Sequence, residues 1–173
     1  FQPSRVPSPF TDRLVMAVLD PEMVAEKVDG SAIYVRIAGW DEPLYSNHDV
    51  IDPLRPTSTA IANRIEATWA VDPWLEGWRE DPASAPRAVI GLAGSTHNRY
   101  IIGALDLSSA EWPEPAGSKG YLWELPWEKL GQPATDNDID AYGLCGRRFT
   151  GVTFGGKYEH VRLYNREGHQ VPR

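Results

Sequence analysis

The chain has 173 residues, of which 42% are hydrophobic and 24% are charged, and its net charge is −7. This length fits one domain, and the apolar fraction is enough for a hydrophobic core, which excludes a wholly disordered chain. The negative charge argues against a protein that coats nucleic acid without specificity.

The N-terminal part of the chain predicts an extended arm and then a strand. Residues 1–12 contain three prolines, so we expect an arm there, followed by a single domain over residues 13–173. Residues 14–19 form a continuous apolar run, which is typical of a buried strand.

The next segment predicts a short helix followed by a second strand. Asp20 provides an N-cap acceptor, and Pro21 suits the first helical position. The helix is expected to end at Asp29-Gly30. Residues 32–37 are rich in β-branched residues and predict a strand.

A long loop, a helix and a connector are expected next. Residues 40–57 contain three prolines and show no periodicity, which predicts a loop of the kind that often carries function. Residues 58–70 predict a helix, because three apolar residues fall on one face: Ile61, Ile65 and Trp69. Asp72-Pro73 is expected to end this helix, and residues 73–86 to form a connector.

The second half of the chain predicts mainly strands. Residues 87–93 and 99–107 are expected to form a β-hairpin, with Gly103 at a bulge or a close-approach point. The remaining elements are a strand, a short helix and a final hairpin, over residues 120–125, 138–144 and 149–164.

This order of elements predicts an α+β fold: a mixed, mostly antiparallel β-barrel capped by one or two helices. The sequence has no run of ~18 apolar residues, so no association with a membrane is expected. A single cysteine excludes an internal disulfide and a cysteine-based zinc site, which favours a cytoplasmic protein.

Few residues of the chain are candidates for catalysis. The acidic run over residues 136–140 lacks the glycine and the glutamate of an EF-hand loop, so we expect a helix cap rather than a metal site. His48 with Asp49 or Asp52 has two interpretations, a general base oriented by a carboxylate or a turn in a polar loop. Cys145 has apolar neighbours, which is typical of a packed thiol. No cofactor is predicted.

Aromatic and basic residues are the more informative features. The chain has seven tryptophans and seven tyrosines. Trp40 and Trp112 stand beside prolines or acidic residues at the ends of predicted strands, where they would stack on a flat ligand or plug the end of a small barrel. Residues 141–173 carry a net charge of +4, which suits a phosphate-contacting surface or a solvated pair of strands.

The segment from Ile102-Gly103 through Trp112-Pro113 to Trp123 resembles the central part of PUA-like domains, especially their EVE and ASCH branches. The span over residues 32–165 is also similar to a group of uncharacterised bacterial single-domain proteins, in which an element like Gly146-Arg147-Arg148 precedes the last strand. This resemblance implies a PUA-like barrel that binds nucleic acid or a modified base, and it supplies no catalytic residues.

The leading hypothesis is therefore a recognition module without catalytic activity. It would bind DNA or RNA, or a single flipped base with or without a modification. The expected ligand-binding residues are three stacking platforms, two readers of base edges and three phosphate contacts: Trp40, Tyr45 and Trp112; Asn47 and His48; and Arg64, Arg147 and Arg148.

Two alternatives from other classes remain open. One is a small hydrolase or nuclease in which His48 is the base and Asp49 or Asp52 orients it. The other is a protein-interaction domain of a bacterial defence system, in which the proline arm and exposed tryptophans contact a protein partner.

Overall fold

The structure is a computed structural model, and it describes residues 17–37, 57–66, 69, 71–95, 97–110, 112, 133–155 and 160–173. The described helices are α2, α3, α4 and α6, with a short 3-10 helix η1: Pro21–Val28, Ser58–Glu66, Asp72–Glu80, Asp136–Ile139 and, for η1, Pro82–Ser84. The described strands β1 to β6 are Ala32–Ile37, Ala88–Ser95, Asn98–Asp106, Arg148–Phe149, Val161–Tyr164 and Gln170–Val171. The α+β class is thereby confirmed.

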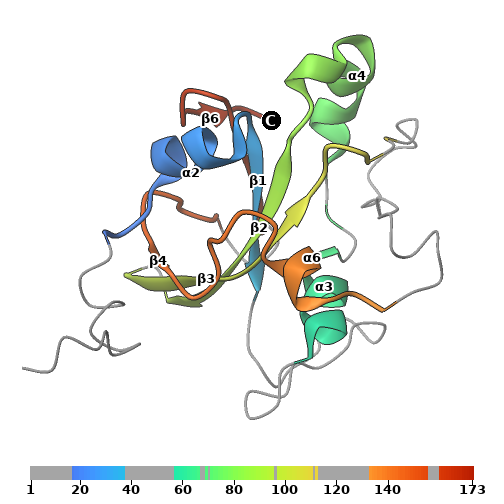
Figure 1. The fold of residues 1–173 in the computed structure, drawn as a ribbon. Helices are drawn as coiled ribbons and strands as arrows, with labels where there is room; N and C mark the ends of the chain where they lie inside the picture. The colour runs from blue at the N-terminus through green and yellow to red at the C-terminus, as the bar shows by residue number, and fades with distance from the viewer. Residues whose placement is uncertain are drawn as a thin grey trace, which may run out of the picture.

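The described strands form one mixed sheet in the order β4-β3-β2-β1-β5-β6 (Figure 1). β1 and β2 are parallel, and the other neighbouring strands are antiparallel. A parallel pair needs a crossover connection, and here that connection contains α3 and α4. The mixed sheet is thus confirmed, whereas the PUA-like barrel stays a prediction.

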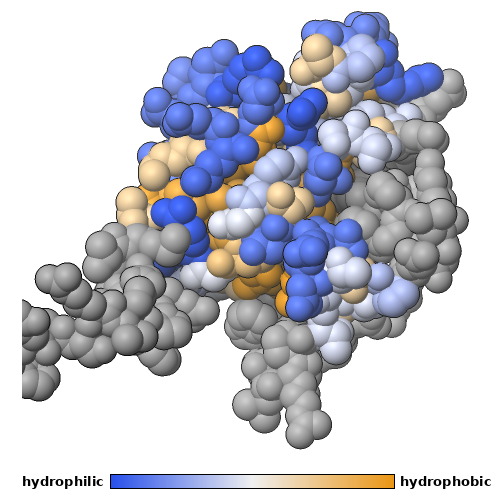
Figure 2. Space-filling model, viewed as in Figure 1, coloured by the Kyte–Doolittle hydropathy of each residue, from blue (hydrophilic) through white to orange (hydrophobic). Residues whose placement is uncertain are grey.

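The sheet buries both of its faces, because successive residues of β1 enter different clusters. Ile33 and Val35 pack with residues of α3 and α4 on one face. Tyr34 packs on the other face with α2 and with the segment over residues 144–154. Figure 1 shows α3 and α4 at opposite ends of the sheet. In the space-filling view, hydrophilic residues cover much of the outer surface of α2 and α4 (Figure 2).

The helix predicted at Asp20 is confirmed. Asp20 Oδ1 accepts a hydrogen bond of 2.9 Å from the Met23 backbone N–H, and Pro21 occupies the first turn. The helix ends at Asp29, which adopts a left-handed conformation with φ 52°. Gly30 has a different role, because a Cβ there would clash with Arg87 Cγ, so its lack of a side chain lets the Arg87 stem pack on the backbone.

The predicted β-hairpin and the close approach at Gly103 are also confirmed. Gly91 pairs with Gly103, and the register shifts between Gly91 and Leu92, which makes Ile102 the extra residue of a bulge. A Cβ on Gly91 would lie 2.7 Å from Ile65 Cγ1, and one on Gly103 would clash with Ile65 Cδ1. The two glycines therefore let α3 pack directly on the hairpin.

The connector predicted over residues 73–86 is wrong, because α4 occupies Asp72–Glu80. Pro73 lies at the start of this helix, where its missing N–H costs nothing. Trp74, Leu75 and Trp78 form its buried side. The two tryptophans are one helical turn apart, and the connector prediction overlooked this helical spacing.

The final hairpin predicted over residues 149–164 is also wrong. β4 and β5 lie far apart in the sheet, because β4 pairs with β3 whereas β5 pairs with β1 and β6. After β4 the chain crosses the face that carries Tyr34, where Val152 and Phe154 are buried. β5 instead forms a hairpin with β6, which was not predicted.

Smaller differences lie at the ends of the described segments. In the apolar run over residues 14–19, Leu19 is buried and bridges to Phe149, but Ala17 and Val18 are exposed. The short helix α6 starts at the acidic run, where Thr135 and Asp138 form a capping box, so the predicted cap is confirmed and the helix begins earlier than expected. The predicted loop over 40–57 (apart from Thr57) and the strand over 120–125 lie outside the described residues. None of the helices that the structure describes is long and apolar enough to cross a membrane.

Candidate functional site: a tryptophan-walled cleft

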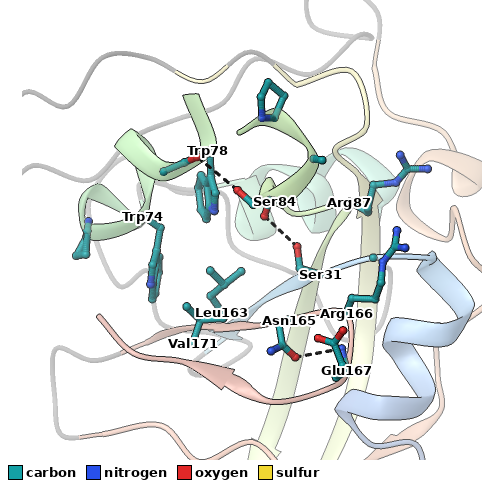
Figure 3. A pocket seen from close by; sticks show the side chains of 15 residues that line it. Ser31, Trp74, Trp78, Ser84, Arg87, Leu163, Asn165, Arg166, Glu167 and Val171 are labelled. Atoms are coloured by element: carbon teal, nitrogen blue, oxygen red, sulfur yellow. Dashed lines mark hydrogen bonds between the residues drawn. The ribbon is translucent and has the colours of Figure 1, made fainter. Parts of the chain in front are cut away.

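A cleft of about 550 Å³ lies between α4, η1 and the β5–β6 hairpin. Its sides come from four segments of the chain, and the turn between α2 and β1 contributes Gly30 and Ser31 (Figure 3). Leu163 and Val171 supply apolar contacts from β5 and β6. The volume is in the range of small-molecule sites in proteins.

Two indoles of α4 form one wall of the cleft. Trp74 and Trp78 stack with ring centroids 6.1 Å apart and an interplanar angle of 23°, and they are 6% and 3% exposed. Trp74 Nε1 donates a 3.0 Å hydrogen bond to Pro172 O, and the Arg173 guanidinium lies 5.4 Å from its ring centroid. Trp112 packs on Trp78, and the distance between their ring centroids is 4.7 Å. The wall is therefore held in place by packing and by a hydrogen bond.

Serine side chains connect two of the segments that line the cleft. Ser84 Oγ donates to Asp81 O at 2.7 Å, at the end of η1. Ser31 Oγ lies within 3.3 Å of Ser84 O and of Ala85 O. These bonds tie the α2–β1 turn to the segment that follows α4, so the cleft is cross-linked by hydrogen bonds (Figure 3).

The turn between β5 and β6 is organised by Asn165. Its Oδ1 accepts hydrogen bonds from the backbone N–H groups of Glu167 at 3.1 Å and His169 at 2.9 Å. Arg166 is held at the cleft by Asp29: Nη2 is 3.3 Å from Asp29 O and 3.7 Å from Asp29 Oδ1. Because these side chains are 68% and 83% exposed, the ion pair is weak and leaves the guanidinium open to a ligand.

Arg87 and Arg166 lie on the side of the cleft opposite the indoles (Figure 3). The carboxylate of Glu167 also lines this side, Asp29 pairs with Arg166, and Arg87 has the Asp106 carboxylate as an electrostatic neighbour, so acidic groups partly balance both guanidinium groups. The arrangement suits a flat apolar group that carries an anion: the ring would lie against the indole wall, and the anion would meet the arginines.

None of the predicted ligand-binding residues that the structure describes lines the cleft. Trp40, Tyr45, Asn47 and His48, with Asp49 and Asp52, are outside the described residues. Arg64 lies on α3 and is only 3% exposed, and burial lowers the pKa of its guanidinium. Arg64 is not part of the predicted stripe of Ile61, Ile65 and Trp69, but α6 packs beside α3, as the hydrogen bond from Ser58 Oγ to Asp136 Oδ1 shows.

Arg147 and Arg148 lie at the opposite edge of the sheet from the cleft, where β4 pairs with β3. Arg147 is half-buried and its Nη2 donates to Ala17 O at 2.8 Å, whereas Arg148 is exposed beside Tyr100. Of the predicted residues that are described, Trp112 comes nearest to the cleft, through its contact with Trp78. The spacing of Trp74 and Trp78 was the signal that could have identified this wall.

Cys145 is a poor nucleophile in this structure. Burial is the largest cause that raises its pKa, to about 12, and the nearby Asp140 carboxylate raises it further. The thiol donates to Ile139 O at 3.2 Å, which agrees with the expectation of a packed cysteine.

We expect Cys145 to react with a thiol reagent at pH 8 on the order of 10³-fold more slowly in the folded protein than in urea, measured as the rate of thiolate release from a chromogenic disulfide. Equal rates in both states would contradict this assignment.

Within the described part of the chain, no group of three or more His, Cys, Asp or Glu side chains could hold a metal ion. Comparisons with protein-family models, with curated proteins and with solved structures found no match for the chain. The cleft is therefore interpreted from the chemistry of its own residues.

Proposed function

We propose that the protein is a non-catalytic recognition module, with a PUA-like barrel, that binds one nucleotide of a nucleic-acid strand in the tryptophan-walled cleft. The observation that carries this proposal is the placement of two indoles and two arginine residues on opposite sides of one cleft. The base packs against the parts of Trp74 and Trp78 that line the cleft, and the phosphate is bound by Arg87 and Arg166.

Each part of the cleft matches one part of a nucleotide. Aromatic side chains bind single-stranded bases through their ring surfaces, independently of sequence. The arginine fork matches the geometry of phosphate oxygens and forms paired hydrogen bonds with them. The serine and asparagine groups around the cleft would contact the edge of the base or the sugar.

The acidic composition of the chain supports a specific site over general binding. With a net charge of −7, most of the surface repels a polyanion, so affinity would come from the cleft and its two arginines. A flipped or modified base would be accommodated in the same way, because the cleft would take one base at a time.

The test is a fluorescence anisotropy titration of labelled single-stranded DNA and RNA, with and without modified bases, at two salt concentrations. We expect saturable binding that weakens with salt. The double variant Arg87→Gln/Arg166→Gln should bind about tenfold more weakly and lower the slope of log K against log salt by about 1.4, for two lost phosphate contacts.

Arg79→Gln is the matched control, because Arg79 is an exposed arginine of α4 that does not line the cleft. It should bind like the unmodified protein. Equal affinity of the double variant and the unmodified protein would overturn the proposed site, and the absence of saturable binding to every oligonucleotide would overturn the proposed function. Salt-insensitive binding to a protein would instead support the protein-interaction alternative.

A further inference from the structure

The other face of the sheet carries a second group of cationic side chains, at the carboxyl ends of β1 and β2. Arg36 lies two residues after Tyr34, and therefore on the face that Tyr34 shares with α2. Arg99 pairs with Gly94 at the end of β2 and stands on the same face as Ile101. α4 and the cleft's indoles pack on the opposite face.

His160 joins this group from β5. The Arg36 backbone N–H donates to His160 O at 2.9 Å, so the two residues are neighbours across the β1–β5 ladder. His160 precedes Arg162 and Tyr164 by two and four residues, and Tyr164 is buried in the cluster that contains Tyr34. Strand alternation therefore places His160 on the face that carries Arg36.

Arg99 is a buried cation whose hydrogen-bond acceptor and ring partner are both neutral groups. It is 5% exposed, its Nη1 donates to Val152 O at 2.7 Å, and its Cζ lies 4.7 Å from the Phe154 ring centroid. A carbonyl and an aromatic ring carry no net charge, and a guanidinium has five N–H donors. The structure pairs Arg99 with no carboxylate among the residues that it describes. Burial, and then the positive charge of Arg36, both lower the pKa of Arg99.

His160 adds a polar atom without a partner. Its Nδ1 is buried and makes no hydrogen bond, whereas most buried ring nitrogens in proteins have a partner. In the absence of a negative charge this arrangement is destabilising, because two arginines repel one another and one of them is buried. The unsatisfied imidazole nitrogen adds to the cost. An anion bound between them would neutralise the repulsion and accept the unused hydrogen bonds.

We propose that Arg36, Arg99 and His160 form a binding site for a phosphate-type oxyanion, on the face of the sheet opposite the tryptophan-walled cleft. The arginines donate to its oxygens, and the imidazole of His160 completes the site through Nδ1. This site does not depend on the nucleotide proposed for the cleft. Its anion would be free inorganic phosphate or the phosphodiester of a nucleic-acid strand, which share the same chemistry.

The experiment is thermal unfolding at pH 7 in sodium phosphate and in sodium chloride of equal ionic strength. At ten times the dissociation constant, phosphate should raise the midpoint of the unmodified protein by about 3–5 °C relative to chloride. Arg36→Gln and Arg99→Gln should lose this rise. Arg36→Gln should also be more stable than the unmodified protein in chloride, because it relieves the repulsion of Arg99.

Two controls separate this site from other effects of phosphate. Arg79→Gln, an exposed variant on the opposite face, and Arg87→Gln/Arg166→Gln in the cleft should both keep the full rise. Arg36 is half-buried, so its variant tests the site even if Arg99→Gln does not fold. Equal midpoints in the two salts for the unmodified protein, or a rise that persists in Arg36→Gln, would overturn the proposal.

A second arm identifies the source of the anion. The same melting experiment with a dinucleotide that contains one phosphodiester is expected to reproduce the rise, and to lose it in Arg36→Gln, if nucleic acid is the source. A rise with inorganic phosphate alone assigns the site to free phosphate. If only the cleft variant Arg87→Gln/Arg166→Gln loses the rise with the dinucleotide, that rise belongs to the cleft. If inorganic phosphate in addition causes no rise, the second site is contradicted.

Discussion

Replacement of Gly168 by alanine should lower the free energy of unfolding by about 2–5 kcal/mol. Gly168 lies in the β5–β6 turn with φ +80°, a left-handed conformation that strains residues with a side chain. A Cβ there would also lie 2.6 Å from both the Cα and the backbone N of Glu22 in α2. Backbone atoms of a helix cannot rotate away, so the turn or the helix would have to shift.

Gly143→Ala is the matched control for this prediction. Gly143 also has a positive φ, +67°, but a Cβ there would meet no atom within 4 Å. Its replacement should therefore cost only the backbone strain, about 1–2 kcal/mol. Urea unfolding at 25 °C measures both losses, and equal losses for the two variants would show that the packing of the turn on α2 contributes nothing to stability.

The same packing positions part of the cleft. Gly168 lies between Glu167 and His169, whose backbone N–H groups bind Asn165 Oδ1, and Arg166 lies in the same turn. The close approach to α2 therefore sets where the Arg166 guanidinium stands relative to the indoles of α4. Stability and ligand binding are coupled at this turn, and we expect Gly168→Ala to weaken nucleotide binding as well.

Local signals in the sequence were enough to predict some elements. The Asp20-Pro21 pair identified α2, because capping and a proline in the first turn depend only on neighbouring residues. The β2–β3 hairpin and the close approach at Gly103 were predicted for the same reason. The signal of α4 is also local, but an Asp-Pro pair can end one helix or begin another, and Asp72-Pro73 begins α4.

Long-range pairing could not be predicted from these signals. An apolar strand such as β1 has the same pattern whether its neighbour is parallel or antiparallel, so nothing local indicated its pairing with β2. The pairing of β5 with β1 depends on contacts between residues more than 100 positions apart in the chain. The final hairpin predicted over residues 149–164 therefore does not form.

The candidate site depends on this long-range pairing, which is why its residues were missed. Arg166 and Trp74 are far apart in the sequence and face one cleft only because β5 pairs with β1 beside α4. The basic C-terminal segment was recognised from its charge, but the sheet separates its members: Arg148 lies at the β4 edge and Arg166 beside the cleft. Charge counts along a chain do not show which faces the fold brings together.

Replacement of Gly77 by leucine should block the cleft without unfolding the protein. Gly77 lies on the exposed side of α4 and lines the cleft, and a Cβ at this position would meet no atom within 4 Å. A leucine side chain would therefore occupy space that the ligand needs rather than space filled by the protein. We expect nucleotide affinity to fall about 10- to 100-fold, which corresponds to a steric cost of roughly 1–3 kcal/mol.

Gly77→Ala separates the two effects of this substitution. Alanine stabilises a helix more than glycine does, so the free energy of unfolding of this variant should be about 0.5–1 kcal/mol higher. The variant leaves the cleft open. Gly77→Leu should retain most of that stability and differ from Gly77→Ala only in binding, which the anisotropy titration and a urea melt measure in parallel. If both variants bind oligonucleotide as tightly as the unmodified protein, no base enters the cleft, because only an unoccupied cleft tolerates a leucine there without loss of affinity.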